Sequence, residues 1–281
     1  MNIFKKTVVG LMAFAAVVAY PLVSTGKTDS KADKITLNKN NTVILNGEID
    51  DASAATTIKS LMELDSGTFG KKKPIYLFVY SPGGSIQAGL ELIEAAKGLD
   101  RQVDTITMFA ASMAFQTVQN LGERLILKNG VLMSHRAAGG FEGNFGGQFP
   151  SQIDSRYSFW LHRLQELDEK TVERTNGKQT LQTYQDAYKN EAWWTGSQSL
   201  QFGYADRIVT LKCDDSLSGT DVHHVSFMGI PVQYETSKCP LITAPMNVKI
   251  EEQAKKMVTD ENAEQIKKKF LESRDLEKNV R

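Results

Sequence analysis

Hydrophobic runs and helical stripes alternate along the chain from about residue 42, and they predict alternating strands and helices. The continuous β-branched and aromatic run Ile75 to Tyr80 predicts a strand covered on both faces. Such alternation is typical of an α/β fold with mainly parallel strands. The expected strands are Thr42–Leu45, Ile75–Tyr80, Val103–Met108, Leu125–Leu127 and Val131–Met133, with a tight turn at Lys128-Asn129-Gly130; the expected helices are Ala52–Leu64, Ile86–Ala96 and Ala111–Asn120.

The second half of the chain has a different pattern. A glycine-rich stretch at 139–147 lacks the lysine and hydroxyl residue of a phosphate loop and predicts an extended segment. An apolar stripe predicts a long helix at about Ile153–Leu167, and a shorter helix is expected at Leu181–Tyr188. After about Val248 we expect a charged, helical tail that is solvated or docks a partner.

The N-terminus has the order of an export signal. Lys5 and Lys6 precede an uncharged, mostly apolar run from Thr7 to Val23, and a polar stretch follows. The run is close to the length of a membrane-spanning helix, so cleavage and retention as an anchor both stay open. We therefore expect a signal peptide or membrane anchor at 1–26 and a polar spacer at 27–41.

Composition narrows the function classes. The 281 residues hold 33 Lys plus Arg against 33 Asp plus Glu, with no basic stripe, which argues against nucleic-acid binding. The two cysteines, Cys213 and Cys239, are either one disulfide of an exported protein or two separate buried thiols. Because no His or Cys residues stand at ligand spacing, no metal site is expected.

Three short segments carry candidate chemistry. Gly83-Gly84 separates a strand from a helix, where free backbone N–H groups can form an oxyanion hole. Ser112 lies at the next helix start after two alanines, and His135 ends a later strand. A serine there is more often a helix cap, and a lone histidine is more often structural. Together they fit a nucleophile and its general base.

The combination resembles the Clp protease proteolytic subunit family. The resemblance is carried by Ser81-Pro82-Gly83-Gly84-Ser85-Ile86-Gln87-Ala88-Gly89, Ala110-Ala111-Ser112-Met113-Ala114, Met133-Ser134-His135 with Gly139-Gly140, Val43 to Ile49, and Trp193 to Ile208, and it covers about residues 42–210. It implies the crotonase-like spiral of repeated β-β-α units with a long handle-type helix. It also implies a Ser-His-Asp triad, an oxyanion hole from the amides of Gly84 and Met113, and no cofactor.

The acid of the triad is not fixed by these motifs. Counting back from Gly203 by the family's spacing gives Ala187, and a one-residue gap would restore Asp186, which is the expected acid. Asp186 could equally be a polar residue on a helix. Glu173, Asn190 and Glu191 are further candidates for orienting the histidine, and His162, His223 and His224 are expected to be surface residues.

The predicted function is that of an exported, periplasmic or extracytoplasmic serine endopeptidase acting on peptides or unfolded proteins. No ATP supply exists outside the membrane, so we expect ATP-independent cleavage without an ATPase partner. A homo-oligomer is expected, and residues 211–281 form an added C-terminal extension.

Three other functions stay open. The first is an inactive Clp-like scaffold or binding protein. The second is a membrane-associated Ser-Lys peptidase that resembles the signal-peptide peptidases and would use Lys128. The third, more distant, is a crotonase acting on acyl-CoA.

Overall fold

The computed structural model describes residues 33–67, 73–137, 150–255 and 259–274. The expected signal or anchor at 1–26 and the glycine-rich stretch at 139–147 lie outside these ranges. Within them, no helix combines the length and the apolar character needed to cross a membrane.

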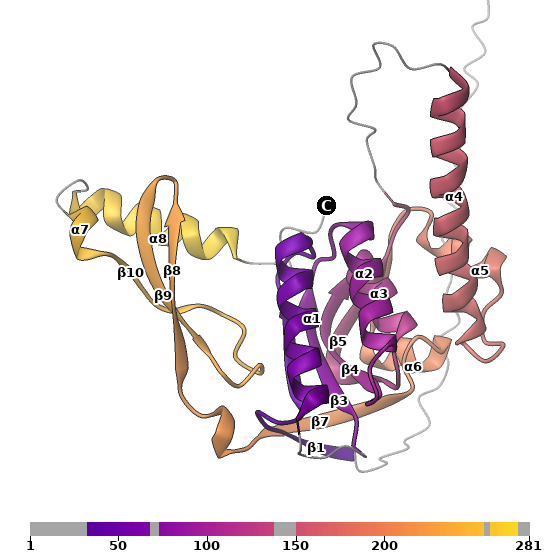
Figure 1. Cartoon of the computed structure of the whole chain (residues 1–281), viewed down its shortest axis with the longest axis horizontal. Helices are drawn as coiled ribbons and strands as arrows, with labels where there is room; N and C mark the ends of the chain where they lie inside the picture. The colour runs from indigo at the N-terminus through magenta and orange to yellow at the C-terminus, as the bar shows by residue number, and fades with distance from the viewer. Residues whose placement is uncertain (1–32, 68–72, 138–149, 256–258, 275–281) are drawn as a thin grey trace, which may run out of the picture. The chain divides into compact units, whose positions relative to one another are not determined.

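The fold is built on a seven-stranded sheet (Figure 1). The strand order is β1-β7-β5-β4-β3-β2; these strands pair in parallel, and β6 pairs antiparallel with β5. The predicted α/β class with a mainly parallel sheet is confirmed. The strands are β1 Asp33–Leu37, β2 Thr42–Asn46, β3 Ile75–Ser81, β4 Val103–Ala111, β5 Arg124–Ser134, β6 Ala192–Thr195 and β7 Arg207–Cys213.

Three helices pack side by side against this sheet: α1 Asp51–Ser66, α2 Ile86–Lys97 and α3 Met113–Asn120 (Figure 1). Asp50 begins α1 with a capping box, in which its side chain accepts a hydrogen bond from the amide of Ser53 and the Ser53 side chain bonds back. The largest hydrophobic cluster lies between these helices and the strands. A second cluster, which includes Leu37, Phe78 and Val209, joins β1, β3 and β7.

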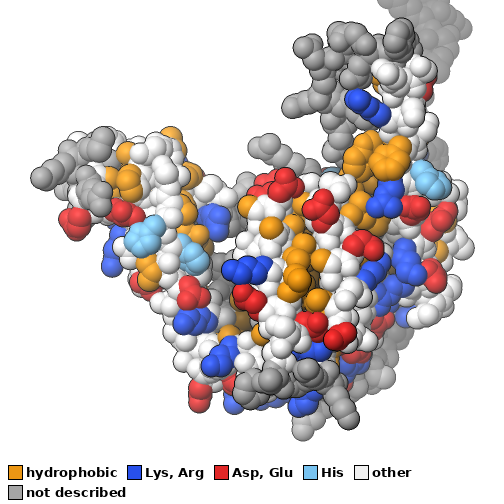
Figure 2. All heavy atoms as spheres, in the orientation of Figure 1, with side chains coloured by type: hydrophobic (Ala, Val, Ile, Leu, Met, Phe, Trp, Pro, Cys, Tyr) orange, Lys and Arg blue, Asp and Glu red, His pale blue; other side chains and the backbone are white. Residues whose placement is uncertain are grey.

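The long helix expected at Ile153–Leu167 is α4, Pro150–Glu173, and it is followed by α5 Leu181–Tyr188 and α6 Gly196–Phe202. Much of α4 faces solvent. Tyr157, Phe159 and Leu161 are about half exposed, at 53%, 58% and 48%. In Figure 2, hydrophobic side chains gather on the surface over this helix.

Strand β5 corrects one prediction. The tight turn expected at Lys128-Asn129-Gly130 does not separate two strands, because β5 runs from Arg124 to Ser134. The two halves of β5 pair with different neighbours: Leu125–Leu127 lies beside β7, and Val131–Ser134 lies beside β6. The pairing with β4 shifts register between the halves, so the turn-like residues form an irregularity within one strand.

The polar spacer expected at 27–41 overlaps β1, which begins at Asp33. Ile35 and Leu37 alternate with polar residues, and Leu37 is fully buried. The strand pairs in register with β7, from Asp33 opposite Val209 to Leu37 opposite Cys213. The short strand β1, in a mostly polar stretch, therefore joins the sheet by pairing with β7, more than 170 positions away in sequence.

The C-terminal region is more ordered than the sequence suggested. Strands β8 Thr220–Phe227, β9 Ile230–Ser237 and β10 Met246–Ile250 form a separate antiparallel sheet, followed by α7 Glu252–Lys255 and α8 Asp260–Ser273. Val232, Tyr234 and Phe270 bury a small core between this sheet and α8. Within the described part of the tail, which was expected to be solvated or to dock a partner, α8 therefore packs on this sheet.

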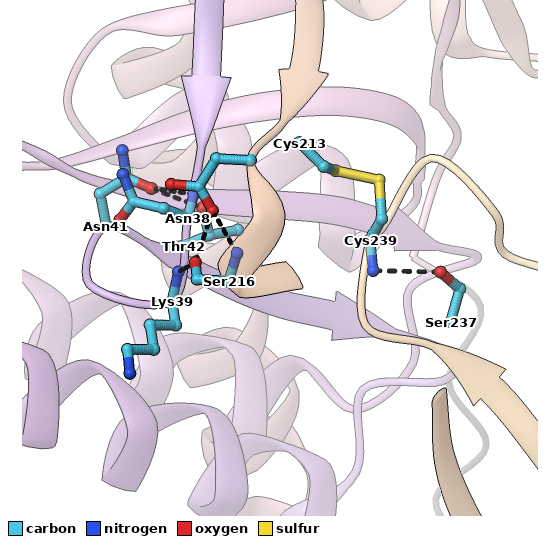
Figure 3. The surroundings of a disulfide bond; sticks show 9 residues. Asn38, Lys39, Asn41, Thr42, Cys213, Ser216, Ser237 and Cys239 are labelled. Atoms are coloured by element: carbon cyan, nitrogen blue, oxygen red, sulfur yellow. Dashed lines mark hydrogen bonds between the residues drawn. A yellow bond between two sulfur atoms is a disulfide. The ribbon is translucent and has the colours of Figure 1, made fainter. Parts of the chain in front are cut away.

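A disulfide between Cys213 and Cys239 ties the end of β7 to the segment after β9 (Figure 3). Nearby, the Ser216 hydroxyl accepts a hydrogen bond from the Lys39 amide at 3.0 Å. The cysteines close a loop of 26 positions, a length at which a disulfide stabilises a fold by about 3 kcal/mol.

Candidate active site

Three neighbouring parallel strands deliver the predicted site residues to one edge of the sheet. Strand β3 ends just before Gly83-Gly84, β4 ends at the residue before Ser112, and β5 ends at the residue before His135. Ala111 lies opposite Met133 in the β4–β5 register, and the Ser112 amide donates to the Met133 carbonyl at 3.0 Å. The carboxyl edge of parallel strands is where α/β proteins commonly build their sites.

Ser112 does not act as an ordinary helix cap. It precedes the first residue of α3, yet its side chain makes no capping hydrogen bond. Its backbone has φ 55° and ψ −122°, a conformation that favours glycine. The hydroxyl instead lies 2.7 Å from His135 Nε2, which is hydrogen-bond distance. The sequence-predicted nucleophile and base are therefore side by side, and both are half-buried.

The backbone around the serine leaves two amides available. Neither Gly84 N–H nor Met113 N–H donates a hydrogen bond within the described part of the chain. Gly84 has φ +142°, and a Cβ at this position would collide with the carbonyl oxygen of Ile49. Gly83 also lies close to the serine, since a Cβ there would be 2.8 Å from Ser112 Cβ. Glycine is therefore required for the close approach of these loops.

The structure does not bring Asp186 to His135. Helix α5 buries Tyr184 and Tyr188, one helical turn apart, and Asp186 lies midway between them on the opposite, exposed face. Its carboxylate accepts a hydrogen bond from Gln182 at 3.0 Å. Among the described residues, His135 Nδ1 has no hydrogen-bond partner.

Glu191 directly precedes β6, the strand that pairs with the end of β5. In this antiparallel pair, Met133 lies opposite Trp193 and the last pair is Ser134 with Ala192; extending the register by one position would place Glu191 opposite His135. Glu191 has φ +71°, and its carboxylate accepts a hydrogen bond from the Trp193 indole at 3.3 Å. Of the remaining candidate orienters, Glu173 ends α4 and pairs with Lys170, and Asn190 is exposed.

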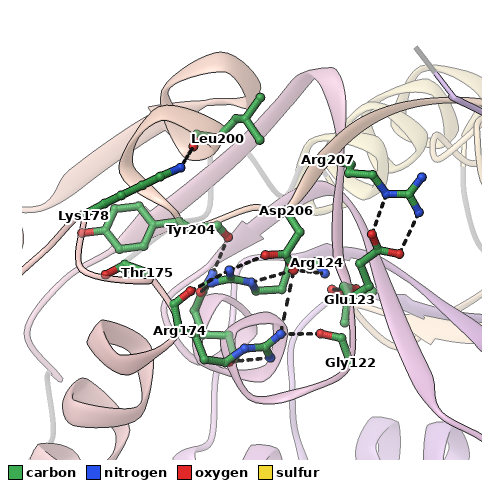
Figure 4. Close-up of polar contacts among 12 residues, drawn as sticks. Gly122, Glu123, Arg124, Arg174, Thr175, Lys178, Leu200, Tyr204, Asp206 and Arg207 are labelled. Atoms are coloured by element: carbon green, nitrogen blue, oxygen red, sulfur yellow. Dashed lines mark hydrogen bonds and ion pairs between the residues drawn. The ribbon is translucent and has the colours of Figure 1, made fainter. Parts of the chain in front are cut away.

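The opposite end of β5 is held by buried charges. Arg124, only 2% exposed, donates to Asp206 from Nε and Nη2, to Gln119 Oε1 at 2.7 Å and to the Arg174 carbonyl at 2.9 Å (Figure 4). Burial alone would raise the pKa of Asp206, but the hydrogen bonds and charge of Arg124 outweigh it and lower that pKa. The positive charge of Arg124 is thus balanced by the carboxylate of Asp206, and the pair stabilises this end of β5.

Lys128 and the three remaining histidines lie outside the Ser112–His135 pair. Lys128 is exposed within β5, and the serine hydroxyl is paired with an imidazole and not with a lysine. His162 faces Glu166, His224 faces Glu251, and His223 stacks on Tyr234 and is half-buried. In the described ranges, no group of three His, Cys, Asp or Glu residues is placed to hold a metal ion.

Comparison with known proteins supports the same site. The family model described as Clp protease matches residues 26–212. The proteins named "ATP-dependent Clp protease proteolytic subunit" from Streptococcus pyogenes serotype M5 (strain Manfredo), Streptococcus sanguinis (strain SK36) and Streptococcus equi subsp. equi (strain 4047) are each 31% identical over 176 residues, which cover 62% of this chain and 86% of theirs. The matched segment contains β1 to β6, the Gly83-Gly84 loop, Ser112 and His135 and ends within β7, one residue before Cys213. This chain therefore belongs to the Clp protease family, a family of peptidases.

Proposed function

We propose that the protein is a serine endopeptidase that cleaves peptides or unfolded proteins through an acyl-enzyme. The observation that carries the proposal is the 2.7 Å hydrogen bond between Ser112 Oγ and His135 Nε2, next to two backbone amides with no partner in the described chain. A serine hydroxyl becomes a useful nucleophile when a neighbouring base accepts its proton. The family's peptidase activity and this geometry agree.

In the proposed mechanism, Ser112 Oγ attacks the carbonyl carbon of the scissile peptide bond while His135 Nε2 takes the hydroxyl proton. The amides of Gly84 and Met113 would then donate to the negatively charged oxygen of the tetrahedral intermediate. His135 passes its proton to the leaving amine, the C–N bond breaks, and the acyl group stays on Ser112. A water molecule, deprotonated by His135, then hydrolyses the ester and frees the serine.

We further propose Glu191 as the acid that orients His135, in place of Asp186. The β5–β6 register supports this choice, because extending it by one position beyond its last pair, Ser134 with Ala192, would place Glu191 opposite His135. A carboxylate at Nδ1 fixes the neutral tautomer in which Nε2 can accept a proton, and it stabilises the imidazolium that forms. A glutamate that turned from the Trp193 indole toward the imidazole would complete the triad.

The proposal includes an oxidising compartment outside the cytoplasm. The Cys213–Cys239 disulfide supports it, since disulfides persist mainly in exported proteins, and so does the signal-like order of residues 1–26. We expect cleavage without ATP there, although the named relatives are called ATP-dependent. Thiol labelling of cells, with and without prior reduction, tests the compartment: both cysteines should be protected until reduced, and two free thiols in intact cells would contradict export.

Self-association is the expected quaternary arrangement. The half-exposed apolar side chains Tyr157, Phe159 and Leu161 on α4 support it, because covering them in an interface would remove apolar surface from water. We therefore propose that α4 contributes to the contact between copies of the chain.

The test of the catalytic proposal is labelling with a fluorophosphonate, which reacts only with an activated serine. The wild-type protein should label, Ser112→Ala should not label at all, and His135→Ala should label at least about 100-fold more slowly. Mass spectrometry of the modified peptide should locate the adduct on Ser112.

Ser60, a partly exposed serine on α1 whose hydroxyl, among the described residues, bonds only to a helix carbonyl, supplies a matched control. Ser60→Ala should label like the wild type. A folded wild-type protein that does not label would instead favour the scaffold function.

A further inference from the structure

A largely buried cluster of polar side chains joins the two segments that carry Ser112 and His135. Gln116 lies in the first turn of α3, and its amide donates to the Ser112 carbonyl at 3.2 Å. Ser134 is the residue directly before His135. Between them lies the hydroxyl of Tyr184, from α5, which accepts from Gln116 Nε2 at 3.2 Å and is 2.9 Å from Ser134 Oγ.

Tyr184 has little freedom to move. The side chain is fully buried and packs against the rings of Phe115, Tyr188 and Tyr204, with centroids 6.2, 4.7 and 5.8 Å away. Burial raises the pKa of its phenol well above the ordinary value, so the hydroxyl stays protonated. It can therefore accept from Gln116 and donate to Ser134 at the same time.

The helix that carries Tyr184 is itself anchored to α4. Asp168 of α4 is buried, and its carboxylate accepts hydrogen bonds from Tyr188 and from Gln185, the latter at 3.1 Å. Thr171, also on α4 and fully buried, donates to Gln116 Oε1 at 3.1 Å. Gln116 thus has both ends of its amide group engaged, one by α4 and the other by α5.

We propose that Tyr184 is a positioning residue for the catalytic pair: its hydroxyl fixes the start of α3 to the end of β5 and so keeps Ser112 and His135 at hydrogen-bond distance. This inference rests on the proposed function, since it assigns a role within that site. The hydroxyl touches neither Ser112 nor His135, and it acts through Gln116 and Ser134. A phenylalanine could fill the same aromatic space, so the hydrogen bonds are what distinguish tyrosine here.

Tyr184→Phe is the direct test, because it removes one oxygen and leaves the ring. We expect the turnover number for a short peptide to fall on the order of 10-fold with little change in KM, since misplacing reacting groups slows chemistry more than binding. The fluorophosphonate labelling rate should fall in parallel. In a His135→Ala background the same substitution should have no further effect.

Tyr204→Phe is the matched control. Tyr204 is also buried and packs in the same aromatic cluster, but its hydroxyl makes no hydrogen bond among the described residues. This variant should keep the wild-type turnover number. A Tyr184→Phe protein that is folded and as active as Tyr204→Phe would overturn the proposal.

Two further measurements keep the test decisive. Where Tyr184→Phe fails to fold, Ser134→Ala breaks the same link from the other side and should lower turnover by a similar factor. The NMR chemical shifts of the His135 ring do not depend on activity, and they should differ between the wild type and Tyr184→Phe because the Ser112–His135 hydrogen bond is displaced. An unlabelled wild type whose His135 ring resonances move in Tyr184→Phe would reject the proposed function while keeping the positioning role; unchanged resonances would reject the positioning role.

Discussion

The two ends of strand β5 differ in how completely their polar side chains are paired. At the first end, Arg124 is almost completely buried and pairs with Asp206, Gln119 and the Arg174 carbonyl. At the other end, His135 is half-buried and hydrogen-bonds only to Ser112 among the described residues. At the first end, the structural end, the charge of Arg124 is paired. At the other end, the proposed chemical end, the amides of Gly84 and Met113 and His135 Nδ1 have no partner in the described part of the chain, so the surrounding contacts must fix the geometry.

The largest expected effect concerns the free nitrogen at the chemical end. Glu191→Gln removes the proposed partner of His135 Nδ1 and should lower the turnover number by roughly 100-fold to 10,000-fold, because the imidazole loses both its tautomer control and the stabilisation of its charged form. Peptide hydrolysis followed under saturating substrate measures it. Asp186→Asn, the matched change on the exposed face of α5, should stay within about twofold of the wild type.

The opposite result would change the assignment. A steep loss in Asp186→Asn with none in Glu191→Gln would place the acid on α5 and would require that helix to turn relative to the sheet. Equal activity in both variants would mean that Ser112 and His135 work without a carboxylate partner.

A substitution at the structural end should lower the stability of the fold and leave the reactivity of Ser112 almost unchanged. Asp206→Asn leaves the buried Arg124 guanidinium without its charge partner and should lower the free energy of unfolding by about 3 kcal/mol at neutral pH. The labelling rate of the folded fraction should change little. Chemical denaturation measures the first quantity, and Glu123→Gln, in a partly exposed pair with Arg207, serves as a control worth less than about 1 kcal/mol.

Lowering the pH should also remove the stabilisation that the Arg124–Asp206 pair provides. Because the pKa of Asp206 is lowered in the folded protein, its stabilisation is fully present above the ordinary pKa of about 3.9 and is lost as the pH falls through the lower folded value. The difference in stability between the wild type and Asp206→Asn should therefore shrink below about pH 4. A difference that stays constant down to about pH 2 would show that the Arg124–Asp206 pair does not act through charge.

The sequence predicted well those features that depend on neighbouring residues along the chain. Apolar runs located β2, β3 and β4 to within a few residues, and the Gly-Gly, Ser and His segments were expected together because their order and spacing resemble the Clp protease family. Ser112 and His135 do meet, as parallel strands end at a common edge. Local pattern was enough for this part of the site.

Features set by pairing between distant segments were predicted less well. Glu191 was only one of several further candidates, and the β5–β6 register, which ends with Ser134 opposite Ala192, is what favours it over Asp186 as the proposed acid. Helical spacing did contain a usable signal, since Tyr184 and Tyr188 mark the buried face of α5 and place Asp186 on the other. The Lys128-Asn129-Gly130 turn composition was likewise overridden by strands pairing on either side of it.

The C-terminal sheet was missed for a related reason. Val232 and Tyr234 alternate with less buried residues on β9, but they form a core only with Phe270, more than 30 positions later. The charged composition of α8 concealed the contacts of Phe270 with Phe227 and Tyr234.

The backbone conformation of Ser112 affects how easily the proposed activity could be lost in evolution. A non-glycine residue at φ 55° carries a conformational cost on the order of 1–3 kcal/mol. Glycine at this position would remove that cost together with the proposed nucleophile, so a change that abolishes the proposed activity would also stabilise the fold. A lineage that used this fold only as a scaffold would meet no barrier to that change.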